Sequence, residues 1–234
     1  GRLPVQALQA AIGYDGRSVQ VEQATVHAGH GRIEAHGAWS PAPDPWRIDA
    51  TLQNVRPGEL HTGLAGAPIS GRAKAQQRGE GIDFDVALQA QGGGGTRALN
   101  GLKLERAQAQ GRWADQVLDL AQLRIDAERA SLQGKLELHV ADQAGRGDLR
   151  ATLPGGSAQF QGRIAPTQGG GELSARVDDA AALQQWLEGL PGLEQAFGGA
   201  SAQGSARLQA RWQGGWRTIR QRIASPAAPL RGSA

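Results

Sequence analysis

Apolar residues occupy every second position over long stretches of this 234-residue chain, with polar or charged residues between them. The clearest stretches are residues 46–52, 82–88, 132–140 and 206–212. Successive side chains of a β-strand point to opposite faces, so a period of two predicts strands with one buried and one solvated face. This alternation is typical of antiparallel strands, because strands of parallel sheets are usually buried on both faces.

The composition supports many short strands. The chain contains 35 Gly and 11 Pro but only six Trp, three Phe and one Tyr, which disfavours a helical bundle. Residues 19–39 align without a gap on residues 118–138, as expected for a repetitive β architecture. A phrase of Gly, a basic residue and an apolar residue also recurs, and we expect its glycine to supply turn or bulge geometry where strands begin. The phrase starts at Gly31, Gly71, Gly111, Gly134 and Gly162.

One segment departs from this period. The helical spacing of apolar residues from Leu183 to Leu190 predicts a helix within residues 178–198, with Asp178 or Asp179 as its N-cap. Its polar face carries Glu and Gln where a helix on a membrane surface would carry Lys or Arg. We therefore expect this helix to cap one end of the sheet.

We interpret residues 1–234 as a single β-rich segment of a longer protein, because the chain opens without Met and already in the rhythm of a strand. Within it we expect repeated strands over 1–177, the helical insertion over 178–198, further strands over 199–224 and a tail over 225–234.

Charge and cysteine content exclude several classes of function. The net charge of +3 is spread along the chain without a basic block, and the Trp residues lie far apart, so we expect no nucleic-acid binding. The absence of Cys excludes disulfides and thiolate metal sites, and it is compatible with an oxidising compartment. No apolar run is long enough to span a bilayer as a helix.

A search for catalytic or metal-binding patterns predicts that the chain is not an enzyme and holds no metal or cofactor. The glycine-rich stretches lack the remaining residues of nucleotide-binding motifs, and there is no Gly-x-Ser-x-Gly elbow. His27, His30 and His36 form the one histidine cluster. His27 and His30 have opposite strand parity and lie around a turn marked by glycines at 29 and 31, so we interpret the cluster as solvated turn residues and not as metal ligands. Asp83 and Asp85 share the polar side of one strand, as surface charges do.

The apolar side of the strands needs a cover, because burial of each large side chain is worth about 1.5–3 kcal/mol. A membrane barrel would need aromatic girdles that one Tyr and three Phe do not provide. A second sheet and the acyl chains of lipids remain as alternatives. The residues that would line a lipid groove are Ile48, Leu52, Ile82, Phe84, Val86, Leu88, Leu102, Leu104, Leu118, Leu120, Leu132, Leu136, Leu138, Val140, Leu208 and Trp212.

Three phrases resemble the repeats of the TamB/AsmA-like family of bridge-like lipid-transfer proteins. They are the strand–turn–strand phrase 123–138, the Leu-Pro-Gly-Leu segment within 183–193, and the strand phrase 204–214 that follows it. The resemblance implies a mainly β fold, namely an elongated, curved antiparallel-type sheet (a β-taco or groove) of repeated short strands with one short helical insertion.

The same resemblance implies a function. The chain would be a periplasmic interior segment of a protein anchored in the inner membrane, carrying phospholipid acyl chains between the inner and outer membranes. The family's further role is outer-membrane biogenesis, including autotransporter assembly, with a TamA-like outer-membrane barrel as partner. A secreted β-solenoid adhesin or carbohydrate-binding module is the alternative, although the chain has few of the aromatic or Asn/Asp-rich platforms that such modules expose. A chaperone surface for unfolded outer-membrane strands is a third interpretation.

Overall fold

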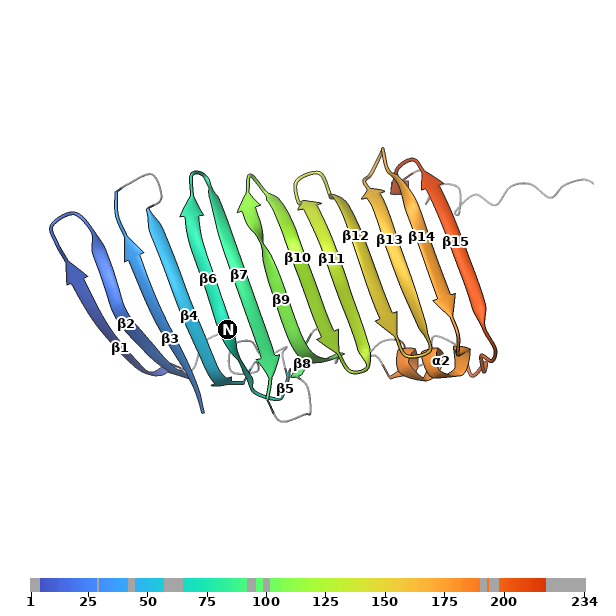
Figure 1. Ribbon diagram of the computed structural model, residues 1–234, viewed down its shortest axis with the longest axis horizontal. Helices are drawn as coiled ribbons and strands as arrows, with labels where there is room; N and C mark the ends of the chain where they lie inside the picture. The colour runs from blue at the N-terminus through green and yellow to red at the C-terminus, as the bar shows by residue number, and fades with distance from the viewer. Residues whose placement is uncertain are drawn as a thin grey trace, which may run out of the picture.

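The computed structural model describes residues 5–28, 30–41, 45–56, 65–91, 96–98, 102–189, 193 and 198–217. These residues form one long antiparallel sheet in which each long strand pairs with the next one along the chain (Figure 1). The mainly β fold is therefore confirmed. The long strands are β1 (Val5–Tyr14), β2 (Val19–Ala28), β3 (Gly31–Trp39), β4 (Trp46–Val55), β6 (Ile69–Arg78), β7 (Gly81–Ala90), β9 (Leu102–Ala114), β10 (Val117–Ala127), β11 (Ala130–His139), β12 (Ala144–Leu153), β13 (Gly156–Ile164), β14 (Gly170–Val177) and β15 (Ala206–Gln213).

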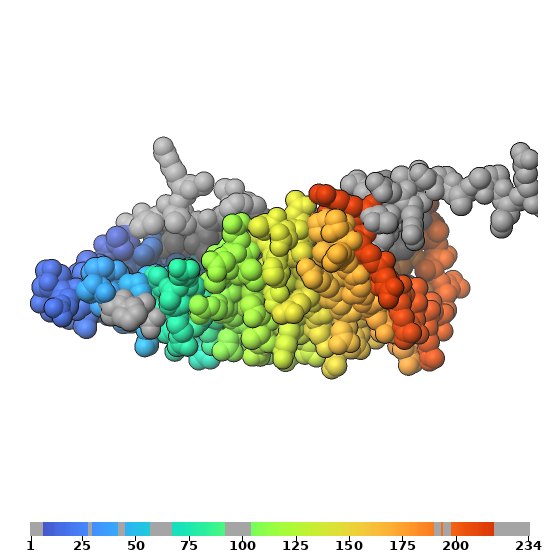
Figure 2. Space-filling view, turned by 90° about the horizontal axis from the view of Figure 1, so that it is seen from above, coloured from blue at the N-terminus to red at the C-terminus, as the bar shows by residue number. Residues whose placement is uncertain are grey.

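Two short strands lie beside this main path. Strand β5 (Ala65–Gly66) pairs with β8 (Thr96–Ala98), and β8 pairs in turn with β9. The sheet is open and uncurled, with β1 at one end and β15 at the other (Figures 1 and 2). The side predicted to line a groove is therefore an open face. Among the described residues few apolar side chains are buried, and Val55 is the one large side chain that is fully so.

The two aligned segments, 19–39 and 118–138, form equivalent hairpins. Val19 pairs with Trp39 in the first and Leu118 with Leu138 in the second, at the same relative positions. The register also shifts at the same place in both hairpins, after Val21 and after Leu120. The prediction of a repeated unit is thus confirmed, and the two units also share the position of a β-bulge.

The recurring glycines have the predicted role in part. Gly31 begins β3, and Gly71, Gly111 and Gly134 each pair with a residue beside a register shift. Four of the five lie inside strands, and each is a point where a neighbouring backbone approaches closely. A Cβ at Gly134 would lie 2.0 Å from the carbonyl oxygen of Asp148, and one at Gly111 would lie 2.1 Å from that of Asp119. Such distances are far below van der Waals contact, so the phrase marks close strand packing, which at Gly71, Gly111 and Gly134 lies beside a β-bulge, and of the five glycines Gly31 alone begins a strand.

Helix α2 (Ala180–Glu188) connects β14 to β15 and lies at the lower ends of the strands (Figure 1). Asp179 is its N-cap and accepts a hydrogen bond from the Ala182 backbone N–H at 3.0 Å. The Trp186 indole N–H donates to the Glu128 carbonyl in the β10–β11 turn at 3.1 Å. The predicted helix and its capping position are confirmed, whereas residues 190–192 and 194–197 of the predicted segment lie outside the described residues.

We expect Trp186→Phe to lower the free energy of unfolding by about 1 kcal/mol, because it leaves the Glu128 carbonyl without this donor. A urea titration followed by circular dichroism measures the change. Gln185→Ala, at an exposed position of the same helix, serves as control and should leave the midpoint unchanged. Equal effects of both substitutions would contradict this role of the indole.

Candidate functional site: an open apolar face

Strand register places apolar residues in rows that cross the sheet at right angles to the strands. Three rows are complete across all thirteen long strands. The upper row is Ile12, Val21, Gly37, Ile48, Ala75, Phe84, Gly111, Leu120, Leu136, Gly147, Gly162, Gly171 and Trp212. The central row is Ala10, Ala24, Ala35, Ala50, Ala73, Val86, Ala109, Leu123, Gly134, Leu149, Phe160, Leu173 and Ala210. The lower row is Leu8, Val26, Ile33, Leu52, Gly71, Leu88, Ala107, Ile125, Leu132, Ala151, Ala158, Ala175 and Leu208.

None of the residues in these three rows carries a charge, and the indole of Trp212 is their one hydrogen-bonding side chain. We call the surface that they form the apolar face. Neighbouring strands lie about 4.8 Å apart, so thirteen strands extend it over roughly 58 Å. The elongated shape is visible in Figure 2.

The predicted groove residues gather on this face. Ten of the sixteen belong to the three rows, and Ile82, Leu118 and Leu138 belong to the next row above. Leu104 pairs with Ala127 below the lower row, and Val140 follows directly after β11. Leu102 lies in β9, but its side chain is outside the described residues.

Sequence reasoning missed other members of the face. Leu123 and Ile125 were missed because the bulge after Leu120 changes the parity of β10 and brings them to the same side as Leu120. Phe160 was missed although Ala158, Phe160 and Ile164 alternate with polar residues in β13.

Most large side chains on the apolar face are half-buried and Leu120 is buried, but several are exposed. Ile48 is 47% exposed, Leu208 56% and Ile12 65%. Within the described ranges the sheet is a single layer, with α2 at its lower end (Figure 1). Exposed apolar patches on soluble monomers rarely exceed a few hundred Å². Larger contiguous apolar surfaces generally mark sites of interaction.

The apolar face contains a hollow of about 530 Å³ over β11–β13, lined mainly by apolar side chains from Leu136 and Leu138 to Phe160 and Ile164. Beside it the Trp212 ring stacks on Phe160 with 5.6 Å between the ring centroids. The ring also lies over two glycines, since a Cβ at Gly171 would come within 2.6 Å of it. Gly171 thus makes room for the aromatic pair at this end of the face.

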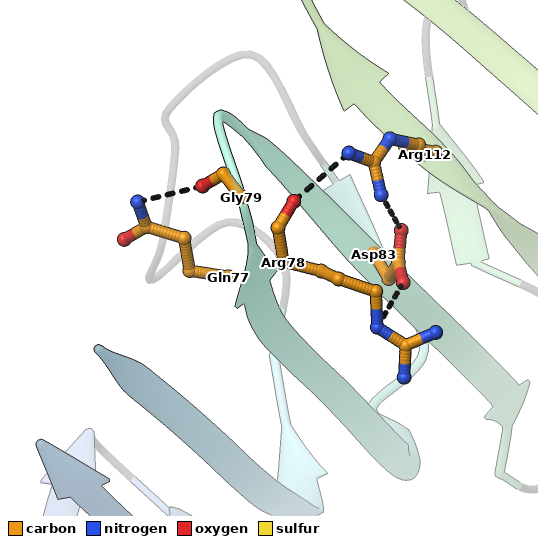
Figure 3. A network of polar contacts seen from close by, with 5 residues as sticks. All are labelled: Gln77, Arg78, Gly79, Asp83 and Arg112. Atoms are coloured by element: carbon orange, nitrogen blue, oxygen red, sulfur yellow. Dashed lines mark hydrogen bonds and ion pairs between the residues drawn. The ribbon is translucent and has the colours of Figure 1, made fainter. Parts of the chain in front are cut away.

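The opposite face is polar, and several of its carboxylates are paired. Figure 3 shows one such group, in which Arg112 binds the Asp83 carboxylate at 2.9 Å and donates to the Arg78 carbonyl at 2.9 Å. The Arg78 guanidinium lies 3.5 Å from the same carboxylate. The network ties β9 to the β6–β7 turn. Asp83 is thus a structural ion-pair partner, and Asp85 is exposed on the same side of β7.

Glu137 occupies a similar position on β11. Its carboxylate accepts a hydrogen bond from His139 Nε2 at 2.6 Å and pairs with Arg146 at 2.6 Å. These two contacts, that from His139 foremost, lower the pKa of Glu137 below its ordinary value. A carboxyl group whose pKa is lower in the folded state stabilises the fold above the unfolded-state pKa, and this stabilisation is lost as the pH falls through the folded-state pKa.

We therefore expect the urea midpoint to fall on acidification from about pH 5 to about pH 3 more steeply in the wild type than in Glu137→Gln, which has no carboxyl to protonate. The measurement is a series of urea titrations at stepped pH. Parallel curves for the two proteins would show that this carboxylate contributes nothing to the pH dependence.

Among the described residues no three His, Cys, Asp or Glu side chains converge as metal ligands would. The search of those residues also finds no helix with the length and apolar character needed to cross a membrane. Comparison with protein-family models, with curated proteins and with solved structures finds no match for this chain. The resemblance to the TamB/AsmA-like family therefore stays a prediction.

Proposed function

We propose that the apolar face carries phospholipid acyl chains between the inner and outer membranes of a Gram-negative envelope. In this proposal the chain is a periplasmic segment of a protein anchored in the inner membrane and supports outer-membrane biogenesis, including autotransporter assembly. A TamA-like barrel is the partner that the proposal implies, contacted through parts of the protein outside this chain. The observation that supports this proposal most strongly is the set of three uncharged rows that cross the whole sheet.

The direction of these rows supports a lipid more than a specific protein ligand. Apolar attraction is non-directional and roughly proportional to the area covered, so a uniform row lets an acyl chain occupy many equivalent positions. The rows run along the long axis of the molecule, and a chain moving along them meets no charged side chain. Movement from strand to strand therefore needs no large desolvation step.

The sizes of the side chains along the apolar face suit linear acyl chains. The central row begins with five alanines, from Ala10 to Ala73, whereas the adjacent rows carry Ile12, Val26 and Ile33 beside them. Small side chains thus lie beside larger ones over much of β1–β4. Further along the face, the hollow over β11–β13 offers space of about 530 Å³ for apolar atoms.

Site-specific photocrosslinking in cells tests the proposal. A crosslinker at Phe84 or Leu136, on the apolar face, should capture phospholipid. Matched crosslinkers at Asp85 and Lys135 lie one residue away on the polar side of the same strands and should capture little. Equal lipid labelling on both sides, or labelling on neither, would reject lipid carriage on this face.

A further inference from the structure

The polar face is not uniformly balanced in charge. Towards the N-terminal half, carboxylates sit between basic residues, as Asp49 does between Arg47 and Lys74. In β12–β15 the polar side carries two carboxylates, Asp148 and Glu172, against six arginines. The arginines are Arg146, Arg150, Arg163, Arg176, Arg207 and Arg211.

Two arginines of this region oppose each other directly. Arg176 on β14 and Arg207 on β15 are cross-strand partners, and like charges in that position destabilise a sheet. Arg176 also pairs with Asp178 at 2.6 Å, whereas Arg207 forms no salt bridge with any residue that the structure describes. The nearby Glu172 is engaged by Gln209 and by Arg211. The charge of Arg207 is therefore left without a counter-ion in this part of the chain.

A hollow of about 600 Å³ lies over these residues on the polar face. Arg150, Arg176 and Arg207 line it, together with hydroxyl and amide groups that include Ser157, Gln159 and Ser174. No carboxylate is among its described lining residues. Three guanidinium groups with neutral hydrogen-bond donors between them make a site of positive potential, and the chemistry that it favours is anion binding.

We propose that this hollow binds a phosphate group, as a phosphate monoester or diester. The planar guanidinium fork donates paired hydrogen bonds that match phosphate oxygens, and Ser and Gln side chains can donate to the oxygens that remain. A phosphate between Arg176 and Arg207 also replaces their repulsion with two attractions. The site lies on the side of the sheet opposite the apolar face, so it is independent of the proposed lipid carriage.

The experiment compares Arg207→Gln with Arg163→Gln. Arg163 opposes Arg146 in the other cross-strand arginine pair and lies outside the hollow, so both substitutions remove one charge from a like-charge pair. Binding of inorganic phosphate at constant ionic strength is followed by thermal unfolding and by calorimetry. In parallel, binding to phosphatidylglycerol vesicles and to phosphatidylcholine vesicles is measured by co-sedimentation.

We expect phosphate to raise the unfolding temperature of the wild type and of Arg163→Gln. Arg207→Gln should bind phosphate about tenfold more weakly or worse and, without phosphate, unfold at a higher temperature than the wild type, because the repulsion is removed. Arg207-dependent binding of phosphate alone would identify a soluble phosphate compound as the ligand. Such binding to phosphatidylglycerol vesicles but not phosphatidylcholine would identify a lipid headgroup. Equal weakening by both substitutions, or binding of neither probe, would overturn the proposal.

Discussion

Leu136→Glu should lower the phospholipid that co-purifies with the chain by about tenfold or more. Leu136 lines the hollow over β11–β13 and stands in the upper row between Leu120 and Gly147. Its full contact with an acyl chain is worth about 1.5–3 kcal/mol, which corresponds to roughly ten- to hundredfold in affinity. A carboxylate in its place loses this contact and must also be desolvated when a lipid binds.

Mass spectrometry of lipid extracts from the purified proteins provides the measurement. The matched control is Gln9→Glu, which adds the same charge at an exposed position on the polar side of β1, outside both hollows. It should retain wild-type lipid content. If both variants keep their lipid, or lose it equally, the apolar face is not where lipid binds. Circular dichroism shows whether each variant is folded.

The largest effect on stability should come from Gly134→Val, which we expect to cost about 3 kcal/mol or more. The added Cβ would lie 2.0 Å from the Asp148 carbonyl oxygen. A side chain could rotate away from such a contact, but a backbone carbonyl in a paired strand cannot. Strands β11 and β12 must therefore separate at a point where they are hydrogen-bonded in continuous register.

Urea denaturation of Gly134→Val beside Gly13→Val checks this expectation. A Cβ at Gly13 meets no atom closer than 4.0 Å, so the second substitution should change the midpoint little. Similar urea midpoints for the two variants would contradict this expectation, because they would mean that β11 and β12 adjust locally and keep their hydrogen bonds.

The period of two was sufficient to predict the strands and the side to which most apolar residues point. It works because strand geometry alternates side chains whatever the tertiary context. It failed beyond the bulge of β10, where one additional residue brings Leu123 and Ile125 to the apolar face. A bulge is a property of two paired strands, so one strand's pattern does not contain it.

Other features depend on pairing between distant segments. The opposition of Arg176 and Arg207 spans α2 and appears only once β14 and β15 are in register. The close approach at Gly134 likewise depends on the backbone of β12. The sequence showed that the phrase containing this glycine recurs, but not what the glycine contacts. Whether a sheet stays open or curls into a groove depends on how strongly its strands twist and coil. The alternation of apolar and polar residues does not determine that twist.

The sequential pairing of the long strands has a consequence for how the chain reaches its fold. Each new long strand pairs with the long strand just before it, so the loops to be closed stay short and the contact order stays low. A chain emerging from one end could add strands onto an already formed edge, one at a time, without waiting for its far end. Growth by accretion of this kind also lets the number of hairpins change without rearranging those already in place.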